Sequence, residues 1–465
     1  MVDRPGATSS RLKKLGQTGG LKSLSKSAPA AEPAPTIAEE VSEAWSPPPL
    51  RSVEDTGLNM LQLADLVLKI LYYNGVLVGS EVAEIIRLPY QNVLDPVMEF
   101  LKREKFVEIS GGGQLGPSSY RYKLGEKGTG KAREALEKSA YAGPAPVPIE
   151  TYVDAMHKQN DRNKTVNEKL LKRVLENLVV GEDMLDKIGP AINSKRSIFL
   201  YGPPGNGKTT LSEKIGRLVL GDDMFIPNAV DVNGQVMQVF DTINHEPSEN
   251  QTTKKLGTGL VNDPRWVRIK RPMSMVGGEL TMAGLDLVFD DINKYYEAPF
   301  QMKANGGMFL IDDFGRQQVR PVDLLNRWIV PLEKGVDFLT LANGQKIEMP
   351  FYVMIVFSTN LDPKDLVDEA FLRRIRYKIE VGNPTPEQHK AVFKIMCKIM
   401  KVPYDEDGYR YLIKEWYIRR DRDLRFVHPR DILSQLLDIA AYREEPPRMT
   451  PSLIDAACAS YFVEL

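Results

Sequence analysis

The sequence has little cysteine, little net charge and no long apolar run. Its 465 residues include only two cysteines, Cys397 and Cys458. These are too few for a closed zinc site or a disulfide framework, so we expect a reducing compartment and a cytoplasmic protein. The formal net charge of −1 excludes an overall attraction to nucleic acid or to an anionic membrane. No apolar run approaches the ~18 residues of a membrane helix, and the N-terminus lacks the hydrophobic core of a secretory signal, so we expect no membrane insertion.

Residues 1–56 have the composition of a disordered tail. Residues 1–30 are basic and rich in Gly, Ser and Thr, and a Pro/Ala-rich stretch follows that ends in Pro47-Pro48-Pro49. Such a segment buries too little apolar surface to offset the entropy lost on ordering. A solvated tail is the expected structure, ahead of a tether for anionic partners or a segment that resembles a transit peptide.

Residues 57–140 have the pattern of a small helical domain. Apolar residues at helical spacing predict a first helix that ends at Asn74-Gly75, and "SEVAEII" predicts a second with a serine N-cap. A third helix is followed by the strand "FVEIS", a glycine-rich loop and the strand "YRYKL". Three helices followed by a two-stranded hairpin resemble a winged helix-turn-helix.

The remaining chain is divided by a proline-rich segment. Residues 141–150 contain "GPAPVP", which predicts a stiff linker and a domain boundary. In residues 151–382, apolar strand-like runs alternate with helices, which predicts an α/β fold with a doubly wound parallel sheet. Residues from about 221 to 305 interrupt that alternation and are expected to be an insertion. Residues 383–465 are expected to form a C-terminal helical lid.

The strongest local motif is "GPPGNGKTT", which directly follows the strand "SIFLY" and opens a helix. This pattern is typical of a P-loop, in which backbone amides and a helix N-terminus surround phosphates. A glycine-rich turn that only matches by chance is the alternative. We expect Lys208 to reach the β- and γ-phosphates of ATP and Thr209 to bind Mg²⁺. The residues expected to bind the nucleotide are Gly202, Pro203, Pro204, Gly205, Asn206, Gly207, Lys208, Thr209 and Thr210.

A second acidic motif, "GMFLIDD", predicts a buried strand that delivers two carboxylates to its tip. In P-loop proteins such a strand completes the Mg²⁺ site. Asp312 is the expected metal-side carboxylate, and Asp313 stands where a base could polarise the attacking water. A solvated acidic turn is the alternative. An aspartate at this second position retains the chemistry of a glutamate with one methylene less reach, so we expect a working site of undetermined speed.

Three further segments carry candidate site residues. The strand "FYVMIVFSTN" ends in Asn360, which could contact the γ-phosphate or orient the water, or simply start a turn. Arg373 and Arg374 follow a short apolar helix, where an arginine pair is more often a solvated surface feature. Arg430 lies in the first turn of a helix that begins at Pro429.

The order of these motifs resembles that of AAA+ ATPases over residues 150–445. The resemblance implies that Asn360 is the sensor 1 residue, that Arg374 with Arg373 beside it is the arginine finger entering a neighbour's site, and that Arg430 is sensor 2. "AFLRR" is similar to the same segment of MoxR-type ATPases. "APFQMKANGGMFLIDDFGRQ" is similar to a stretch of bacterial enhancer-binding activators, but the Gly-Ala-Phe-Thr-Gly-Ala motif with which those activators engage their sigma factor is absent.

The predicted insertion contains a basic segment, "DPRWVRIKRPMSMVGGEL". Basic residues around an aromatic could grip single-stranded nucleic acid, although an amphipathic strand with solvated charges is the more frequent outcome. "MVGGEL" could form a mobile loop facing a pore. The basic residues concerned are Arg265, Arg268, Lys270 and Arg271, which surround Trp266.

The sequence as a whole favours a Mg²⁺-dependent AAA+ ATPase in a homo-oligomeric ring that remodels a protein client. Two alternatives stay open: a DNA-associated motor or regulator that uses the winged helix, and a slow nucleotide switch that times an assembly. The third helix offers Asp95 and Glu99 and no positive charge before Lys102, so we do not favour DNA as its partner.

Overall fold

The computed structural model describes residues 45–112, 116–160, 165–176, 178–219, 221–249, 262–366 and 369–462. All of them belong to one compact unit, Trp45–Leu465. Most of the predicted tail lies outside the described residues. Its last part, however, is packed against the fold, which the tail prediction did not foresee. Trp45 meets Trp266 edge to face, with 5.3 Å between ring centroids, because a large aromatic side chain gains more from burial than its short segment loses on ordering.

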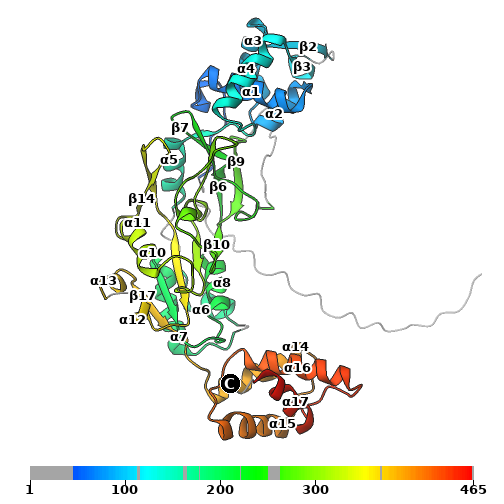
Figure 1. Ribbon diagram of the computed structural model, residues 1–465, viewed down its shortest axis with the longest axis vertical. Coiled ribbons are helices and arrows are strands. Elements are labelled where there is room, and N and C mark those ends of the chain that lie inside the picture. The colour runs from blue at the N-terminus through cyan, green and yellow to red at the C-terminus, as the bar shows by residue number, and fades with distance from the viewer. Residues whose placement is uncertain are drawn as a thin grey trace, which may run out of the picture. The chain divides into compact units, whose positions relative to one another are not determined.

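The three predicted N-terminal helices and the predicted hairpin occur in the expected order, and the structure adds a short strand, β1, and a fourth helix, α4 (Figure 1). Their bounds are α1 Met60–Asn74, β1 Leu77–Val78, α2 Gly79–Ile86, α3 Asp95–Arg103, β2 Val107–Gly112, β3 Tyr120–Leu124 and α4 Glu126–Lys138. The strands form an antiparallel sheet in the order β1-β3-β2. The predicted serine N-cap of α2 is wrong: the N-cap is Val78, two residues before Ser80, and the Glu81 carboxylate accepts from the Val78 amide at 2.7 Å.

A five-stranded parallel sheet forms the centre of the nucleotide-binding part. Its order is β10-β13-β16-β5-β17, from strands Met273–Val276, Met308–Ile311, Met354–Thr359, Ile198–Tyr201 and Tyr377–Glu380. All four strand pairs are parallel. The side chains of the three central strands, β13, β16 and β5, are almost entirely buried, as expected for a sheet covered on both faces. The edge strands β10 and β17 also carry exposed side chains, among them Met275 and Lys378. The helices around it are α6 Glu168–Val174, α7 Glu182–Ser194, α8 Lys208–Val219, α10 Pro321–Arg327, α11 Ile329–Lys334, α12 Pro363–Leu366 and α13 Glu369–Leu372.

The predicted insertion contains one strand of this central sheet. Strand β10 lies within the range 221–305 and pairs with β13, so the insertion is divided into two parts. The first part contains β6 Asp223–Pro227, β7 Ala229–Val232, β8 Gln235–Gln238 and β9 Trp266–Lys270. The second contains β11 Val288–Asp290, β12 Tyr295–Glu297 and α9 Phe300–Lys303. The sequence missed β10 because it has only four residues and follows a basic segment.

The proline-rich linker is part of a second sheet. Val147–Pro148 forms β4, which pairs with β7 in the order β11-β12-β8-β7-β4, and α5 Ile149–Gln159 follows at once. Val147 and Ala145 are completely buried. The end of the predicted stiff linker is thus a strand of this sheet. Ala145 and Val147 are buried beside β7, where their apolar side chains are removed from water.

A hairpin and a helical lid complete the fold. The hairpin pairs β14 Val336–Thr340 with β15 Lys346–Pro350. The lid contains α14 Pro386–Ile399, α15 Glu406–Leu412, α16 His428–Tyr442 and α17 Pro451–Tyr461 (Figure 1). The lid has its own core, which includes Phe393, Leu412 and Leu433. No helix among the described residues is long and apolar enough to cross a bilayer.

Candidate functional site: a P-loop at the carboxyl edge of the sheet

The P-loop connects β5 to α8 as predicted. The backbone angle φ is 136° at Gly202 and 77° at Gly205, values that residues with a side chain rarely adopt. A Cβ on Gly202 would lie 2.4 Å from the Val381 carbonyl oxygen, and one on Gly205 would lie 2.7 Å from a methyl of Val427. Glycine is therefore required at both positions, because the loop fits closely between the end of β17 and the lid.

The side chain of Lys208 is held by several hydrogen bonds at the site. It is buried, and its Nζ donates to the carbonyl oxygens of Gly202 at 2.9 Å and Pro203 at 3.0 Å. It also donates to Oδ1 of Asn360 at 2.6 Å. Burial lowers the pKa of Lys208, while the nearby Asp312 and Asp313 oppose that shift. The ammonium thus stands at the mouth of the P-loop with three oxygen partners whose places phosphate oxygens could take.

Thr209 and Asp312 meet at the start of α8. The Thr209 hydroxyl donates to Oδ2 of Asp312 at 2.8 Å. A hydroxyl and a carboxylate are hard oxygen ligands that suit Mg²⁺, which is held at such sites by few protein groups and completed by phosphates and water. The donor set therefore fits a magnesium ion that arrives with the nucleotide.

Asp313 adopts an uncommon backbone conformation beside Asn360. Its φ is +48°, and its Oδ1 accepts from Nδ2 of Asn360 at 2.9 Å. Asn360 thus connects Lys208 to Asp313 through the two ends of one amide. The strand order explains the contact, since β16 lies between β5 and β13 and all three end at the same edge. The structure brings together Lys208, Thr209, Asp312, Asp313 and Asn360.

The three predicted arginines lie in different places. Arg430 borders the P-loop cavity, with its Nε 2.8 Å from Oδ1 of Asp431. Arg374 is bound within its own chain, where its Nε is 2.5 Å from Glu333, and Arg373 is exposed. Neither Arg373 nor Arg374 lines the P-loop cavity formed by the described residues.

A cavity of about 560 Å³ extends from the P-loop to the lid. Gly205, Asn206, Gly207 and Thr210 line one end. This volume is in the range of small-molecule sites, and its walls suit a flat aromatic base. The apolar part of the wall is formed by Leu178, Val180, Met184, Val392, Met396 and Ile399.

Several contacts between the P-loop and the lid were missed by the sequence analysis. Asn206 is buried and donates to Asn383 at 2.8 Å, and Arg425 donates to the carbonyl of Pro204 at 2.8 Å. The Val427 amide donates to the Gly205 carbonyl at 2.9 Å. Arg425 and Pro204 are 221 positions apart, so no local pattern could reveal their contact.

Glu279 lies two residues beyond Gly277, at the carboxyl end of β10. Its carboxylate accepts from the Gly277 amide at 2.9 Å, and such hydrogen bonds lower its pKa. Strand β10 pairs with β13, which ends at Asp312. "MVGGEL" therefore begins as an edge strand and leads to the site edge. This position replaces our expectation of a pore loop for the first two residues of that segment.

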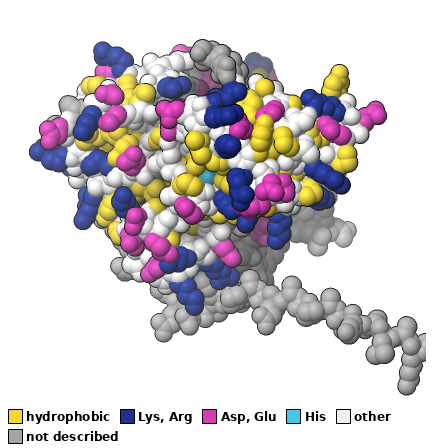
Figure 2. All heavy atoms as spheres, turned by 90° about the horizontal axis from the view of Figure 1, so that it is seen from below, with side chains coloured by type: hydrophobic (Ala, Val, Ile, Leu, Met, Phe, Trp, Pro, Cys, Tyr) yellow, Lys and Arg dark blue, Asp and Glu magenta, His cyan; other side chains and the backbone are white. Residues whose placement is uncertain are grey.

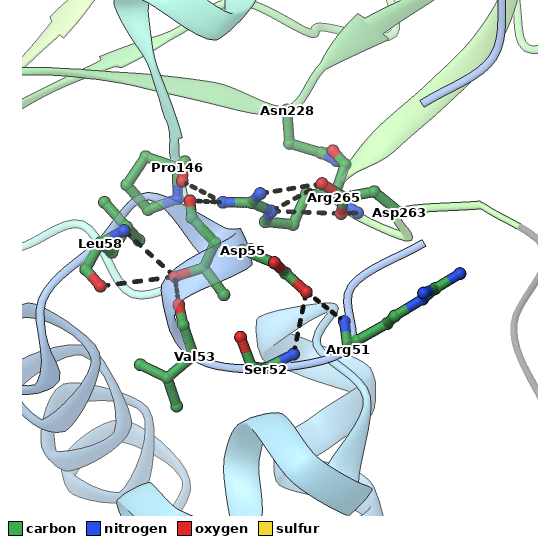
Figure 3. Close-up of polar contacts among 10 residues, drawn as sticks. Arg51, Ser52, Val53, Asp55, Leu58, Pro146, Asn228, Asp263 and Arg265 are labelled. Atoms are coloured by element: carbon green, nitrogen blue, oxygen red, sulfur yellow. Dashed lines mark hydrogen bonds and ion pairs between the residues drawn. The ribbon is translucent and has the colours of Figure 1, made fainter. Parts of the chain in front are cut away.

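The basic residues of the insertion are bound by other residues of the same chain. The buried Arg265 is ion-paired to Asp263 at 2.8 Å and also donates to the carbonyls of Thr56 and Pro146 (Figure 3). Arg268 pairs with Asp223, Lys270 pairs with Glu246, and Arg271 donates to two backbone carbonyls.

Trp266 is buried as well. The segment therefore offers no aromatic platform for a base, and its cations are engaged within the protein. The nucleic-acid grip considered from the sequence is not supported. The amphipathic-strand alternative is correct only in part, because Arg265 is buried and not solvated.

Comparisons with known proteins cover parts of the chain. Residues 385–460 match a family model described as a domain of unknown function (DUF8689). The vesicular-fusion protein SEC18 of Saccharomyces cerevisiae is 21% identical over 235 residues, which are 50% of this chain and 25% of SEC18. Its counterpart in Schizosaccharomyces pombe is 23% identical over 222 residues, which are 47% of this chain and 22% of that protein. The chain thus spans about a quarter of the length of these curated relatives.

Two solved structures overlap with the chain at low similarity. NtrX from Brucella abortus in complex with ADP has a TM-score of 0.38 and 13% identity, with 73% of this chain and 68% of NtrX covered. The RuvB Holliday junction branch migration motor of Thermotoga maritima has a TM-score of 0.36 and 13% identity, with 62% of this chain and 72% of RuvB covered.

The strand order decides the fold class. The polar-tipped strand β16 separates the P-loop strand β5 from the acidic strand β13, and a helical lid follows the last strand. This arrangement makes Lys208, Asn360 and Asp313 neighbours, as the resemblance in sequence requires. By this strand order and by the geometry of its P-loop edge, the chain has an α/β P-loop fold with a parallel central sheet.

Proposed function

We propose that this protein binds Mg-ATP at the P-loop and hydrolyses it. The contact chain from Lys208 through Asn360 to Asp313 is the observation that carries the proposal. It places a cation for the phosphates, an amide and a carboxylate along one edge. When bound, Mg²⁺ supplies charge neutralisation on the phosphates.

The residues of the chain divide the remaining work. Lys208 and the amides of the P-loop bind the β- and γ-phosphates, and Thr209 with Asp312 orients the metal. Asp313 accepts a proton from the attacking water, and Asn360 fixes that carboxylate with respect to the terminal phosphate. Arg430 and Arg425 lie where they can respond to the phosphates from the lid side.

The lid supplies the coupling between hydrolysis and movement. Val427 and Arg425 bind backbone groups of the P-loop, and the base would lie between the lid and the segment before α7. A change at the γ-phosphate would therefore alter the same loop that supports the lid. We propose that this movement remodels or assembles a protein client, within a homo-oligomeric ring in which Arg373 and Arg374 face a neighbour's nucleotide.

The proposal also includes more specific assignments. They include the MoxR-like subtype, the winged-helix adaptor at residues 57–140, the nucleotide-binding core at 151–382, the lid at 383–465 and the cytoplasmic location.

The free cysteines Cys397 and Cys458 are buried, and burial raises their pKa to about 11 and about 12, in keeping with thiols that stay reduced and inert.

The test is phosphate release by the full chain in the presence of ATP and Mg²⁺. Lys208→Ala should remove turnover and weaken binding of a fluorescent ATP analogue, because the lysine offsets phosphate charge. Arg217→Ala, on the exposed side of the same helix, is the matched control and should behave like the wild type. Equal turnover in the wild type and Lys208→Ala would refute the proposal.

A further inference from the structure

The turn that follows β13 carries both carboxylates of the site. Its backbone is unusual, because Asp313 has φ +48° and Gly315 has φ +100°. A left-handed conformation is unfavourable for a residue with a side chain, and an aspartate adopts it where local hydrogen bonds hold it. The conformation of Asp313 therefore requires a restraint.

The side-chain amide of Gln317 binds this turn at three points. Its Nε2 donates to the carbonyl oxygens of Asp312 at 2.9 Å and Asp313 at 3.1 Å. Its Oε1 accepts from the amide of Gly315 at 2.8 Å. The opposite orientation of the amide would place oxygen against two carbonyls and nitrogen against an N–H, so the hydrogen-bond pattern fixes the orientation.

The remainder of the turn has separate anchors. Phe314 is completely buried, its amide donates to the Ser358 carbonyl at 2.7 Å, and its carbonyl accepts from the Thr359 hydroxyl at 2.7 Å. These bonds tie the turn to β16 without Gln317. The Asp313 carbonyl also accepts from the Arg316 amide at 2.9 Å. What Gln317 adds is one side-chain donor shared by the two carbonyls that flank the Cα of Asp313, and thus a restraint on the direction of the Asp313 side chain.

We propose that Gln317 is a positioning residue for ATP hydrolysis, which holds the Asp313 carboxylate toward Asn360 and the attacking water. The inference rests on the proposed ATPase function and deepens it. Gln317 is half-buried and acts through Asp313, so it need not touch the substrate. Its loss should lower the rate of the chemical step and leave nucleotide binding intact.

The experiment measures steady-state ATP turnover of the full chain with Gln317→Ala and Gln317→Glu. Glutamate keeps the acceptor for Gly315 but loses the donor for the two carbonyls. We expect kcat to fall at least about tenfold in both variants, with KM for ATP, affinity for a fluorescent ATP analogue and Tm unchanged. Gln318→Ala, one position further and exposed, is the matched control and should keep the wild-type kcat.

A double-mutant cycle separates positioning from a general structural effect. In an Asp313→Asn background, adding Gln317→Ala should cause little further loss, because the group that Gln317 positions is already disabled. An unchanged kcat in Gln317→Ala, or the same fold loss in both backgrounds, would overturn the inference. So would a parallel loss of nucleotide affinity.

Failure of the inference is distinct from failure of the proposed function. If the wild type turns over ATP and Lys208→Ala does not, the ATPase proposal stands whatever Gln317 does. If the wild type shows no Mg²⁺-dependent turnover, both fall together.

Discussion

Asp312 and Asp313 are adjacent in the chain but have different partners. Asp312 binds the Thr209 hydroxyl, whereas Asp313 binds the side chain of Asn360. The two side chains leave a tight turn in different directions, so one carboxylate faces Thr209 at the start of α8 and the other faces the tip of β16. This difference in partners predicts a difference in function.

We predict that Asp313→Asn binds ATP but hydrolyses it about 10²–10⁴-fold more slowly, the loss expected for a positioned general base. Asp312→Asn should instead raise the Mg²⁺ concentration needed for half-maximal turnover. Phosphate release across a Mg²⁺ titration measures both effects. Near-normal turnover in Asp313→Asn would assign the role to another carboxylate, and Glu279 at the end of β10 would be the first to test.

Local motifs predicted the residues of the site better than their conformations. The P-loop and the acidic strand were recognised because each function resides in consecutive residues. The left-handed conformation of Asp313 was not predictable, because it occurs in a turn whose hydrogen bonds come from Gln317 and, through Phe314, from Ser358 and Thr359 across the sheet. The partners of Arg265 are likewise far apart in the chain, so its burial was missed.

At the scale of single elements, the lid contains two buried histidines. His389 is completely buried, its Nδ1 lies 3.0 Å from the Tyr409 hydroxyl, and its Nε2 has no hydrogen-bond partner within the described residues. His428 lies 3.0 Å from the Tyr417 hydroxyl. Burial lowers the pKa of each to about 4, with neighbouring positive charge adding to the shift.

These shifts make the lid sensitive to acid. The folded pKa lies below the ordinary value of 6.5, so between pH 6.5 and about 4 the unfolded chain takes up protons that the folded lid does not. The free energy of unfolding should therefore fall as the pH decreases through this window, by up to about 3 kcal/mol for each histidine.

Thermal melting at pH 7 and pH 5 measures this loss of stability in acid. His389→Phe, which keeps an aromatic ring in place, should show a smaller loss than the wild type. An equal loss in both proteins would contradict the assignment to His389.

The order of elements was largely predictable, whereas their pairing was not. Helical periodicity predicted α1, and the alternation of strands and helices predicted the parallel sheet. Strand β10 and strand β4 were missed because each is short and gains its stability from a neighbour distant in the chain, β13 and β7 respectively. For such strands, tertiary pairing determines the structure and local propensity does not.

At the scale of the whole molecule, Arg373 and Arg374 bear on assembly. Neither lines the P-loop cavity formed by the described residues of its own chain. We predict that Arg373→Ala or Arg374→Ala is inactive alone, and that mixing either with Lys208→Ala restores part of the turnover, because each mutant supplies what the other lacks. A titration of one mutant into the other, followed by phosphate release, is the measurement.

A control separates the proposed arginine-finger role of Arg374 from its ion pair with Glu333. Glu333→Gln removes the carboxylate that pairs with Arg374 but leaves the arginine in place, so this variant should retain turnover. Full activity of a strictly monomeric preparation would contradict the shared site.

The distribution of charge over the molecule favours a protein partner over duplex DNA. Figure 2 shows a face on which lysine and arginine side chains are interspersed with acidic ones, in keeping with a formal net charge of −1. In the N-terminal helical part, Lys102 pairs with Glu99 at 2.9 Å and Lys123 pairs with Glu108 at 3.0 Å. The helix that would read a groove, α3, begins with Asp95. These acids oppose the counterion release that drives binding to DNA.

We predict that the full chain binds mixed-sequence duplex DNA no more tightly than about 1 µM at physiological salt, within the range of non-specific binding. Replacing the acids, in Asp95→Asn with Glu99→Gln, should strengthen binding, since the cations nearby would then face phosphates without competition. Fluorescence anisotropy of a labelled duplex at several salt concentrations measures both proteins. Submicromolar affinity of the wild type with a steep salt dependence, lost in Arg121→Ala with Lys123→Ala, would replace the protein client with DNA as the partner of residues 57–140.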